Sequence, residues 1–139
     1  MKIKNTIIIL FSILLIFVSC SKNKGEAEIR AAVNEMHDEL IEYEKNMLRA
    51  ANSKEVADEM IRHYRKMAEI ADVFKKLGEK YPELNDEKYM GKYKNEALVE
   101  EVDKKVNTVR EKYDDEPEVA NVWGKILNEI QADSTVSSD

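Results

Sequence analysis

The stretch "AANSKEV", residues 50–56, decides the fold because it separates two long segments with regularly spaced apolar residues. Asn52 is a residue type that caps the start of a helix, and Glu55, three positions later, completes a capping-box arrangement. One helix therefore ends within this stretch, and another begins there. We expect a tight turn here, at which the chain folds back on itself.

The segments on either side of the turn carry apolar residues at alternating spacings of four and three. The first covers residues 26–51, and the second runs from the turn to about Leu77 or Lys80. This heptad spacing is typical of helices that pack along their length. The seam residues are Ile29, Val33, Met36, Leu40, Tyr43, Met47 and Ala50 in the first segment, and Val56, Met60, His63, Met67, Ile70, Phe74 and Leu77 in the second.

Folding the chain near Asn52 aligns the two seams layer by layer. In every aligned pair the two residue numbers sum to 103, which is also the offset that a short turn permits. The sequence therefore predicts an antiparallel helical hairpin. The aligned pairs are Leu40 with His63, Met36 with Met67, Tyr43 with Met60, and Val33 with Ile70.

Two more helices are expected after the hairpin. Pro82 disfavours helix at the preceding residue, and Asn85 or Asp86 is suited to cap a third helix that ends near Tyr113. Asp115 or Glu116, placed before Pro117, is a start signature for a short fourth helix, because proline is favoured at the first helical position. Its apolar stripe contains Val119, Val122 or Trp123, Ile126, Leu127 and Ile130.

These elements predict an all-α domain over residues 26–132, followed by a disordered tail over residues 133–139. Four helices with short connections are typical of an antiparallel up-down bundle. A three-helix core with the short fourth helix laid across it is the alternative. The sequence shows no internal repeat.

The N-terminus has the composition of a secretory signal peptide over residues 1–19. Lys2 and Lys4 make it positively charged, and an apolar core follows over residues 7–18, broken only by Ser12. A stable span of a bilayer needs about 20 apolar residues, so this core is short for a transmembrane helix. A charged start, a short apolar core and a small residue at the end indicate export.

Phe17-Val18-Ser19-Cys20 resembles the lipobox of bacterial lipoproteins, with Phe17 at the position where leucine is usual. The resemblance implies cleavage between Ser19 and Cys20, attachment of a diacylglycerol to the Cys20 thiol, and a tether over residues 20–25. Cys20 is the only cysteine, so an internal disulfide is impossible. The chain resembles the small all-helical lipoproteins of spirochaetes, whose functions are unknown.

This resemblance implies a location in the bacterial cell envelope, anchored to a membrane by lipid. Two or more acyl chains anchor stably where one does not. The residue after the cysteine is Ser21. In enteric bacteria an aspartate at this position resembles a signal for retention in the inner membrane, so serine here favours the outer membrane. Removing Lys2 and Lys4 from 22 basic residues leaves 20 against 28 acidic ones, a net charge of −8. An acidic surface argues against nucleic acid as a partner.

No catalytic residues and no cofactor are predicted. One group of residues is a candidate metal site. Met60, His63 and Met67 share a face of the second helix, and Met36 and His37 lie near the same level. Thioether and imidazole groups are ligands for copper(I) or haem iron. The same residues also suit a core, with methionine as a gap-filler and a His63 nitrogen satisfied by the Tyr43 hydroxyl.

The sequence thus predicts a non-enzymatic envelope lipoprotein whose helical domain is structural or binds an unidentified envelope protein. A homo-oligomer is a further expectation, because a heptad seam can also serve a second chain. A metal or haem carrier using the Met/His layer is the alternative.

Overall fold

The computed structural model describes residues 25–136, and the predictions for the signal peptide and Cys20 lie outside this range. Most of the described residues are helical, and none of them lies in a strand. The all-α prediction is confirmed. The elements are α2 (Glu26–Arg49), α3 (Ser53–Lys80), the 3-10 helix η1 (Pro82–Asn85), α4 (Glu87–Gly91), α5 (Glu96–Glu111), α6 (Pro117–Ala120) and α7 (Val122–Val136).

The described residues form two compact units. The first unit comprises residues 25–37 and 68–95, and the second comprises residues 38–67 and 96–136. The helices α2 and α3 each contribute one half to each unit, whereas α5, α6 and α7 belong to the second unit alone.

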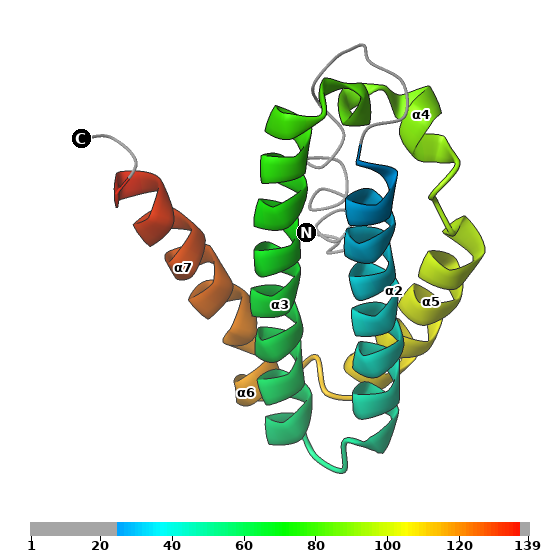
Figure 1. Cartoon of the computed structure of the whole chain (residues 1–139). Helices are drawn as coiled ribbons and strands as arrows, with labels where there is room; N and C mark the ends of the chain where they lie inside the picture. The colour runs from blue at the N-terminus through cyan, green and yellow to red at the C-terminus, as the bar shows by residue number, and fades with distance from the viewer. Residues whose placement is uncertain (1–24, 137–139) are drawn as a thin grey trace. The chain divides into compact units, whose positions relative to one another are not determined.

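The predicted turn lies in the second unit, between the end of α2 at Arg49 and the start of α3 at Ser53 (Figure 1). The Asn52 side-chain oxygen accepts a hydrogen bond from the Glu55 backbone N–H at 3.0 Å. Glu55 reaches back and accepts hydrogen bonds from the Ala51 backbone N–H at 2.8 Å and from the Asn52 side-chain amide at 3.0 Å. The capping prediction is confirmed, and this exchange of hydrogen bonds satisfies donors that a helix start would otherwise leave free.

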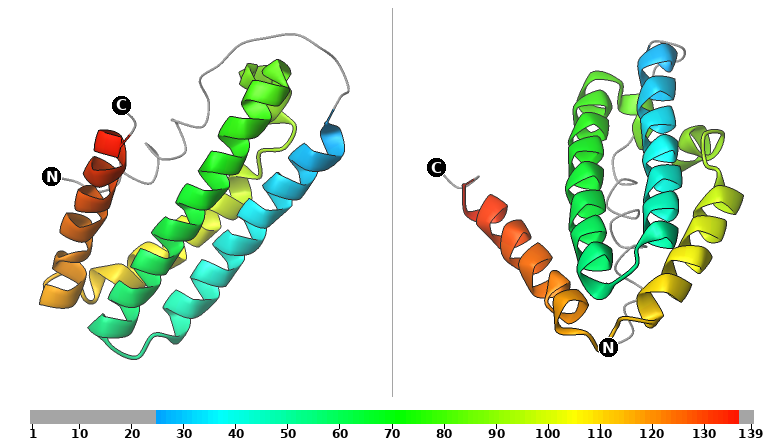
Figure 2. Two further views of the ribbon diagram at one scale, coloured as in Figure 1. Left: turned by 60° about the vertical axis from the view of Figure 1, so that its left-hand side comes forward. Right: turned by 90° about the horizontal axis from the view of Figure 1, so that it is seen from below.

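Contacts between α2 and α3 in the second unit lie close to the predicted register. Tyr43 stacks on His63 with ring centroids 3.8 Å apart, and Asn46 donates a hydrogen bond to Glu59 at 3.3 Å. The numbers in these pairs sum to 106 and 105, within one helical turn of the predicted 103. Within this unit the two helices lie side by side and run in opposite directions (Figures 1 and 2).

All four predicted helical segments contribute to one core in the second unit. Chain direction alternates from α2 to α3, α5 and α7 within the unit, as expected for an up-down arrangement (Figure 1). The contribution of α6 and α7 means that the fourth segment is part of this core. The core residues are Leu40, Tyr43, Met47, Val56, Ala57, Met60, Val102, Val106, Val109, Val119, Val122 and Ile126.

The prediction of one continuous third helix from residue 85 or 86 to Tyr113 is wrong. The short α4 ends at Gly91, and α5 begins only at Glu96. Gly91 is a weak helix former, and Asn95, just before α5, is a residue type that favours a helix start. The break places α4 in the first unit and α5 in the second. The Asp86 cap is confirmed, since its carboxylate accepts hydrogen bonds from the backbone N–H groups of residues 88 and 89.

The predicted fourth helix begins as expected but is divided. Glu116 is the N-cap residue and Pro117 occupies the first turn of α6, which ends at Ala120 before α7 starts at Val122. The helix α7 continues to Val136 and therefore includes residues 133–136 of the predicted tail. The rest of the predicted tail, residues 137–139, lies outside the described residues.

The first unit has a smaller core that begins at Gly25. Gly25 has a φ of +93°, and a Cβ atom there would lie 2.3 Å from the ring of Tyr81. The last residue of the predicted tether is therefore in direct contact with the folded domain. The buried apolar residues of this unit are Ile29, Ala32, Val33, Met36, Ile70, Phe74, Leu77, Leu84 and Tyr93.

Replacing Gly25 by alanine is expected to lower the free energy of unfolding by about 1–2 kcal/mol, because a left-handed backbone is unfavourable for an L side chain. The new methyl group also displaces the Tyr81 ring, whose hydroxyl donates to Glu28 at 3.2 Å. Urea unfolding followed by circular dichroism measures the change. Gly124→Ala is the control, since a Cβ there meets nothing within 4 Å and alanine in a helix is stabilising by roughly 0.5–1 kcal/mol. Equal effects at the two glycines would contradict the prediction.

Candidate functional site

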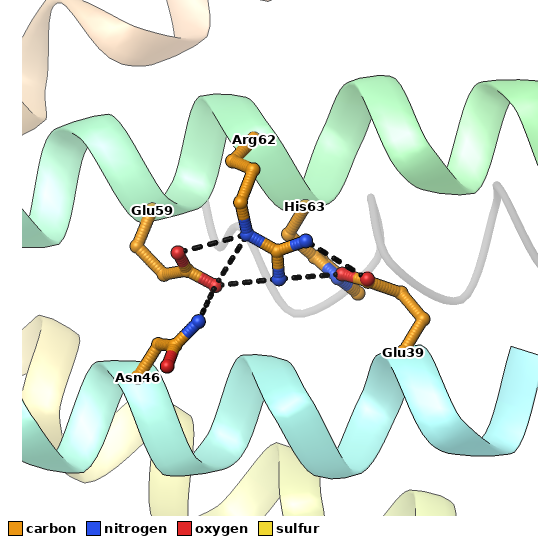
Figure 3. Close-up of polar contacts among 5 residues, drawn as sticks. All are labelled: Glu39, Asn46, Glu59, Arg62 and His63. Atoms are coloured by element: carbon orange, nitrogen blue, oxygen red, sulfur yellow. Dashed lines mark hydrogen bonds and ion pairs between the residues drawn. The ribbon is translucent and has the colours of Figure 1, made fainter.

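A partly buried polar cluster joins α2 and α3 in the second unit (Figure 3). Arg62, on α3, extends across to Glu39, on α2, and two guanidinium nitrogens donate hydrogen bonds to the two carboxylate oxygens at 2.9 Å each. The Glu39 side chain is only 3% exposed. This bidentate geometry is the strongest form of an arginine–carboxylate pair. We call Glu39, Asn46, Glu59, Arg62 and His63 the interhelical cluster.

Glu59 closes the other side of the interhelical cluster. It lies one turn before Arg62 on α3, and accepts hydrogen bonds from the Arg62 guanidinium at 2.7–3.0 Å. Asn46, on α2, donates to the same carboxylate at 3.3 Å. One guanidinium thus connects two carboxylates on two helices, as Figure 3 shows.

His63 completes the interhelical cluster. Its Nδ1 lies 2.7 Å from a Glu39 oxygen, and because the carboxylate only accepts, Nδ1 carries the hydrogen. The expected hydrogen bond from His63 to the Tyr43 hydroxyl is wrong. The two rings lie parallel, with an interplanar angle of 2°, so Tyr43 covers a face of the imidazole. The contact between these two seam residues is therefore a ring stack.

Burial and hydrogen bonding act in opposite directions on the cluster's charges. Burial raises the pKa of Glu39, but hydrogen bonds from His63 and Arg62 outweigh it and hold this pKa below its ordinary value. Hydrogen bonds to Glu59 and Glu39 raise the pKa of Arg62. Burial raises the pKa of Tyr43, which keeps its hydroxyl neutral. Glu39 and Arg62 are therefore held as an ion pair.

The arrangement favours a structural role for the interhelical cluster. Glu39 accepts three hydrogen bonds, two from Arg62 and one from His63. A general base must lie within reach of a substrate proton, and the Glu39 side chain, 3% exposed and held by three donors, offers a substrate little access. The hydrogen bonds of Glu39 with Arg62 and His63, and that of Asn46 with Glu59, run between the two helices and link α2 to α3 at this point.

The three candidate metal ligands all lie on α3 in the second unit. Met60 is 4% exposed and belongs to the apolar core, whereas Met67 is half-buried. His63 has committed Nδ1 to Glu39, which leaves Nε2 as its ligand atom. Within residues 25–136 no group of three or more His, Cys, Asp or Glu residues has the placement of a metal site.

The candidate lipid-attachment residue Cys20, and Ser19 at the cleavage position, lie outside the described residues. Their assignment stays a prediction from the sequence. Of the helices that the structure describes, none has the length and apolar character needed to cross a membrane.

The interhelical cluster was not predicted from the sequence, although a signal for it exists. Glu39, Asn46 and Glu59 each immediately precede a seam residue. In heptad notation this is the g position, whose side chains make interhelical contacts. Arg62 occupies the c position, which usually faces solvent. Its long side chain crosses to α2, and no spacing rule predicts that reach.

Comparison of the chain with models of protein families, with curated proteins and with solved structures finds no match. Functional proposals therefore depend on the residues of this chain alone.

The stabilising effect of Glu39 is expected to depend on pH. Since its pKa is lower in the folded protein than its ordinary value of 4.5, the ionised carboxylate stabilises the fold above that value. This contribution is lost as the pH falls through the lower, folded-state pKa. Urea unfolding between pH 7 and pH 3 measures it. Glu39→Gln is expected to show a weaker decline in stability over this range, and an unchanged acid dependence would contradict the assignment.

Proposed function

We propose that this protein is a lipid-anchored lipoprotein of a bacterial envelope whose helical domain acts by binding protein, without enzymatic activity. Support for the anchor comes from Phe17-Val18-Ser19-Cys20 at the end of a short apolar core. The contact of Gly25 with Tyr81 adds a geometric consequence, because the folded domain begins five residues after Cys20. Five extended residues reach less than about 18 Å, so the anchor would hold the domain close to the membrane.

The observation that carries the binding role is the placement of large apolar side chains on the surface. In the part of the chain that the structure describes, Ile41, Leu48, Val73 and Leu127 are 39–56% exposed. Ile41 and Leu48 lie seven residues apart and therefore on the same face of α2. Exposed apolar side chains two helical turns apart on one face form the kind of surface that docks against another helix.

The anchor is tested by mass spectrometry of the full chain isolated from bacterial membranes. We expect an N-terminal peptide that begins at Cys20 and carries the mass of a diacylglycerol. Cys20→Ala should abolish that modification and release the cleaved chain from the membrane or leave it unprocessed. Phe17→Leu is the matched control, since it restores the usual lipobox residue and should be processed at least as completely. An unmodified Cys20 thiol in the mature chain would overturn the proposal.

The metal or haem carrier is the second candidate, and one observation favours it. Hydrogen bonding of a ligand histidine to a carboxylate is common in metal sites, because it fixes the tautomer and orients the other nitrogen. The Glu39–His63 pair has this form. Titration of the full chain with copper(I) and with haem tests the idea. Stoichiometric binding that is lost in His63→Ala and kept in His37→Ala would support a carrier, and no binding would exclude it.

A further inference from the structure

The face of α2 that points away from the core of the second unit carries six exposed residues, which we call the outer face. They are Asp38, Ile41, Glu42, Lys45, Leu48 and Arg49. Its two apolar members are the exposed residues Ile41 at 51% and Leu48 at 55%. On a helical projection these six positions fall within about 120° of arc. The outer face is therefore one continuous surface.

The charges of the outer face are separated by sign along the helix. Asp38 and Glu42 lie at its N-terminal end, and Lys45 and Arg49 lie at its C-terminal end. Each pair is four residues apart, a spacing at which like charges repel and destabilise a helix. Within the described part of the chain, none of these four side chains makes a hydrogen bond or an ion pair.

Elsewhere the chain uses the same spacing with opposite charges. Exposed pairs four residues apart form ion pairs on α2, α3 and α5, and such pairs stabilise a helix. These pairs are Glu26 with Arg30, Lys54 with Asp58, Asp72 with Lys76, and Glu101 with Lys105. The outer face of α2 departs from this pattern, so its charge order calls for a partner outside the chain.

A second copy of the outer face, running antiparallel, supplies that partner. We align Ile41 of one copy with Leu48 of the other, and Leu48 with Ile41. In this register, residues that face each other have numbers that sum to 89. In this register Arg49 lies between Asp38 and Glu42 of the second copy, with sums of 87 and 91. Lys45 lies beside Glu42 of the second copy, again with a sum of 87, and across the twofold axis from Lys45 of the second copy, with a sum of 90. A parallel arrangement would place every charge opposite its own kind, whereas the antiparallel one does so for Lys45 alone.

We infer that two copies of this protein associate through the outer faces of α2 in an antiparallel, twofold-symmetric pair. The heptad seam predicted to serve a second chain is occupied, since Tyr43 and Met47 are buried in the core of their own chain. The inference rests on the protein-binding part of the proposed function and names its partner. It is independent of lipid at Cys20.

Disulfide trapping in the full chain tests the arrangement. The twofold axis passes between residues 44 and 45, so Lys45→Cys is expected to give a disulfide-linked dimer after mild oxidation of membranes from expressing cells. The wild-type chain shows how much dimer forms through Cys20 alone. Lys54→Cys, at an exposed position on α3, should give no more dimer than the wild-type chain. Ile41→Cys and Leu48→Cys should cross-link when co-expressed but not singly. No excess dimer for Lys45→Cys, or dimer for Ile41→Cys alone, would overturn the inference.

A charge exchange tests the cause of association without cysteine chemistry. Lys45→Glu with Arg49→Glu makes the outer face wholly acidic, and Asp38→Lys with Glu42→Lys makes it wholly basic. Each double variant is expected to lose at least about ten-fold in self-association, measured by co-purification of differently tagged full chains. Exchange of all four charges restores the complementary order and should restore self-association. A four-fold variant that stays monomeric would contradict the charge argument.

These experiments separate the inference from the anchor proposal. Mass spectrometry of each preparation reports whether Cys20 is modified, and cross-linking reports whether the outer faces meet. A modified Cys20 without the Lys45→Cys dimer would leave the anchor and remove the pair. An unmodified Cys20 with that dimer would do the reverse.

Discussion

Replacing Arg62 by methionine is expected to lower the free energy of unfolding by about 2–3 kcal/mol. The change removes the guanidinium that neutralises Glu39, 3% exposed, and Glu59, 11% exposed. It leaves Glu39 with only His63 as a partner and Glu59 with only Asn46. Loss of one member of a fully buried ion pair costs more, about 3–5 kcal/mol. Because the Arg62 side chain is 36% exposed, water can solvate part of the Glu39 charge in the variant, and the expected loss is smaller. Urea unfolding at pH 7 measures the difference.

Two further variants show whether the effect comes from the unpaired charge. Lys54→Met removes a cation from the exposed pair with Asp58 on the same helix, and should leave stability nearly unchanged. The double variant Glu39→Met with Arg62→Met removes both members of the Glu39–Arg62 pair and should recover part of the loss, while Glu59 still lacks its cation. If the double variant were less stable than Arg62→Met, the ion pair itself would be stabilising, contrary to the expectation.

The second large effect is expected at Met47, which is 0% exposed in the core of the second unit. Met47→Ala removes a buried thioether chain and leaves a cavity, and should destabilise the protein by about 2–4 kcal/mol. Leu48 is the control because it is the next residue and is 55% exposed. Leu48→Ala should change stability little, since its side chain loses little contact with the chain's own core. Thermal and urea unfolding of the two variants give the comparison.

The Met47→Ala and Leu48→Ala variants also distinguish an effect on folding from an effect on association. Met47 belongs to the core of its own chain, whereas Leu48 belongs to the outer face of α2. Leu48→Ala is therefore expected to weaken self-association while leaving the monomer folded. If Leu48→Ala destabilised the monomer as strongly as Met47→Ala, the outer face would be part of the fold, and the inferred pair would lose its surface.

The sequence predicted the hairpin because the information for it is local. A capping residue at Asn52 with Glu55 fixes where α3 begins, and heptad spacing fixes which face of each helix is apolar. A short turn then permits only one alignment of those faces, so the register near Tyr43 and His63 follows. The helix starts at Asp86 and Pro117 were predictable for the same reason. Asp86 caps its helix through its own side chain, and the ring of Pro117 suits the first turn of a helix.

The breaks in the later helices could not be read from the same rules. Gly91 and Asn95 weaken a helix without forbidding one, and whether it breaks depends on which unit each half packs into. The predicted tail is a similar case, because a polar composition is compatible with a helix end as well as with disorder. Helix propensities of this kind contribute little free energy, so tertiary packing decides whether the segment is helical.

Only the tertiary structure decided the chemistry between α2 and α3. Sequence spacing places Glu39 beside the seam, but its burial depends on α3 covering it and on Arg62 crossing between the helices. The same is true of His63, whose residue type suits a metal ligand or a core residue equally. The stack on Tyr43 and the bond to Glu39 come from a neighbouring helix. Interactions between distant residues depend on the final geometry of both partners, which no local pattern contains.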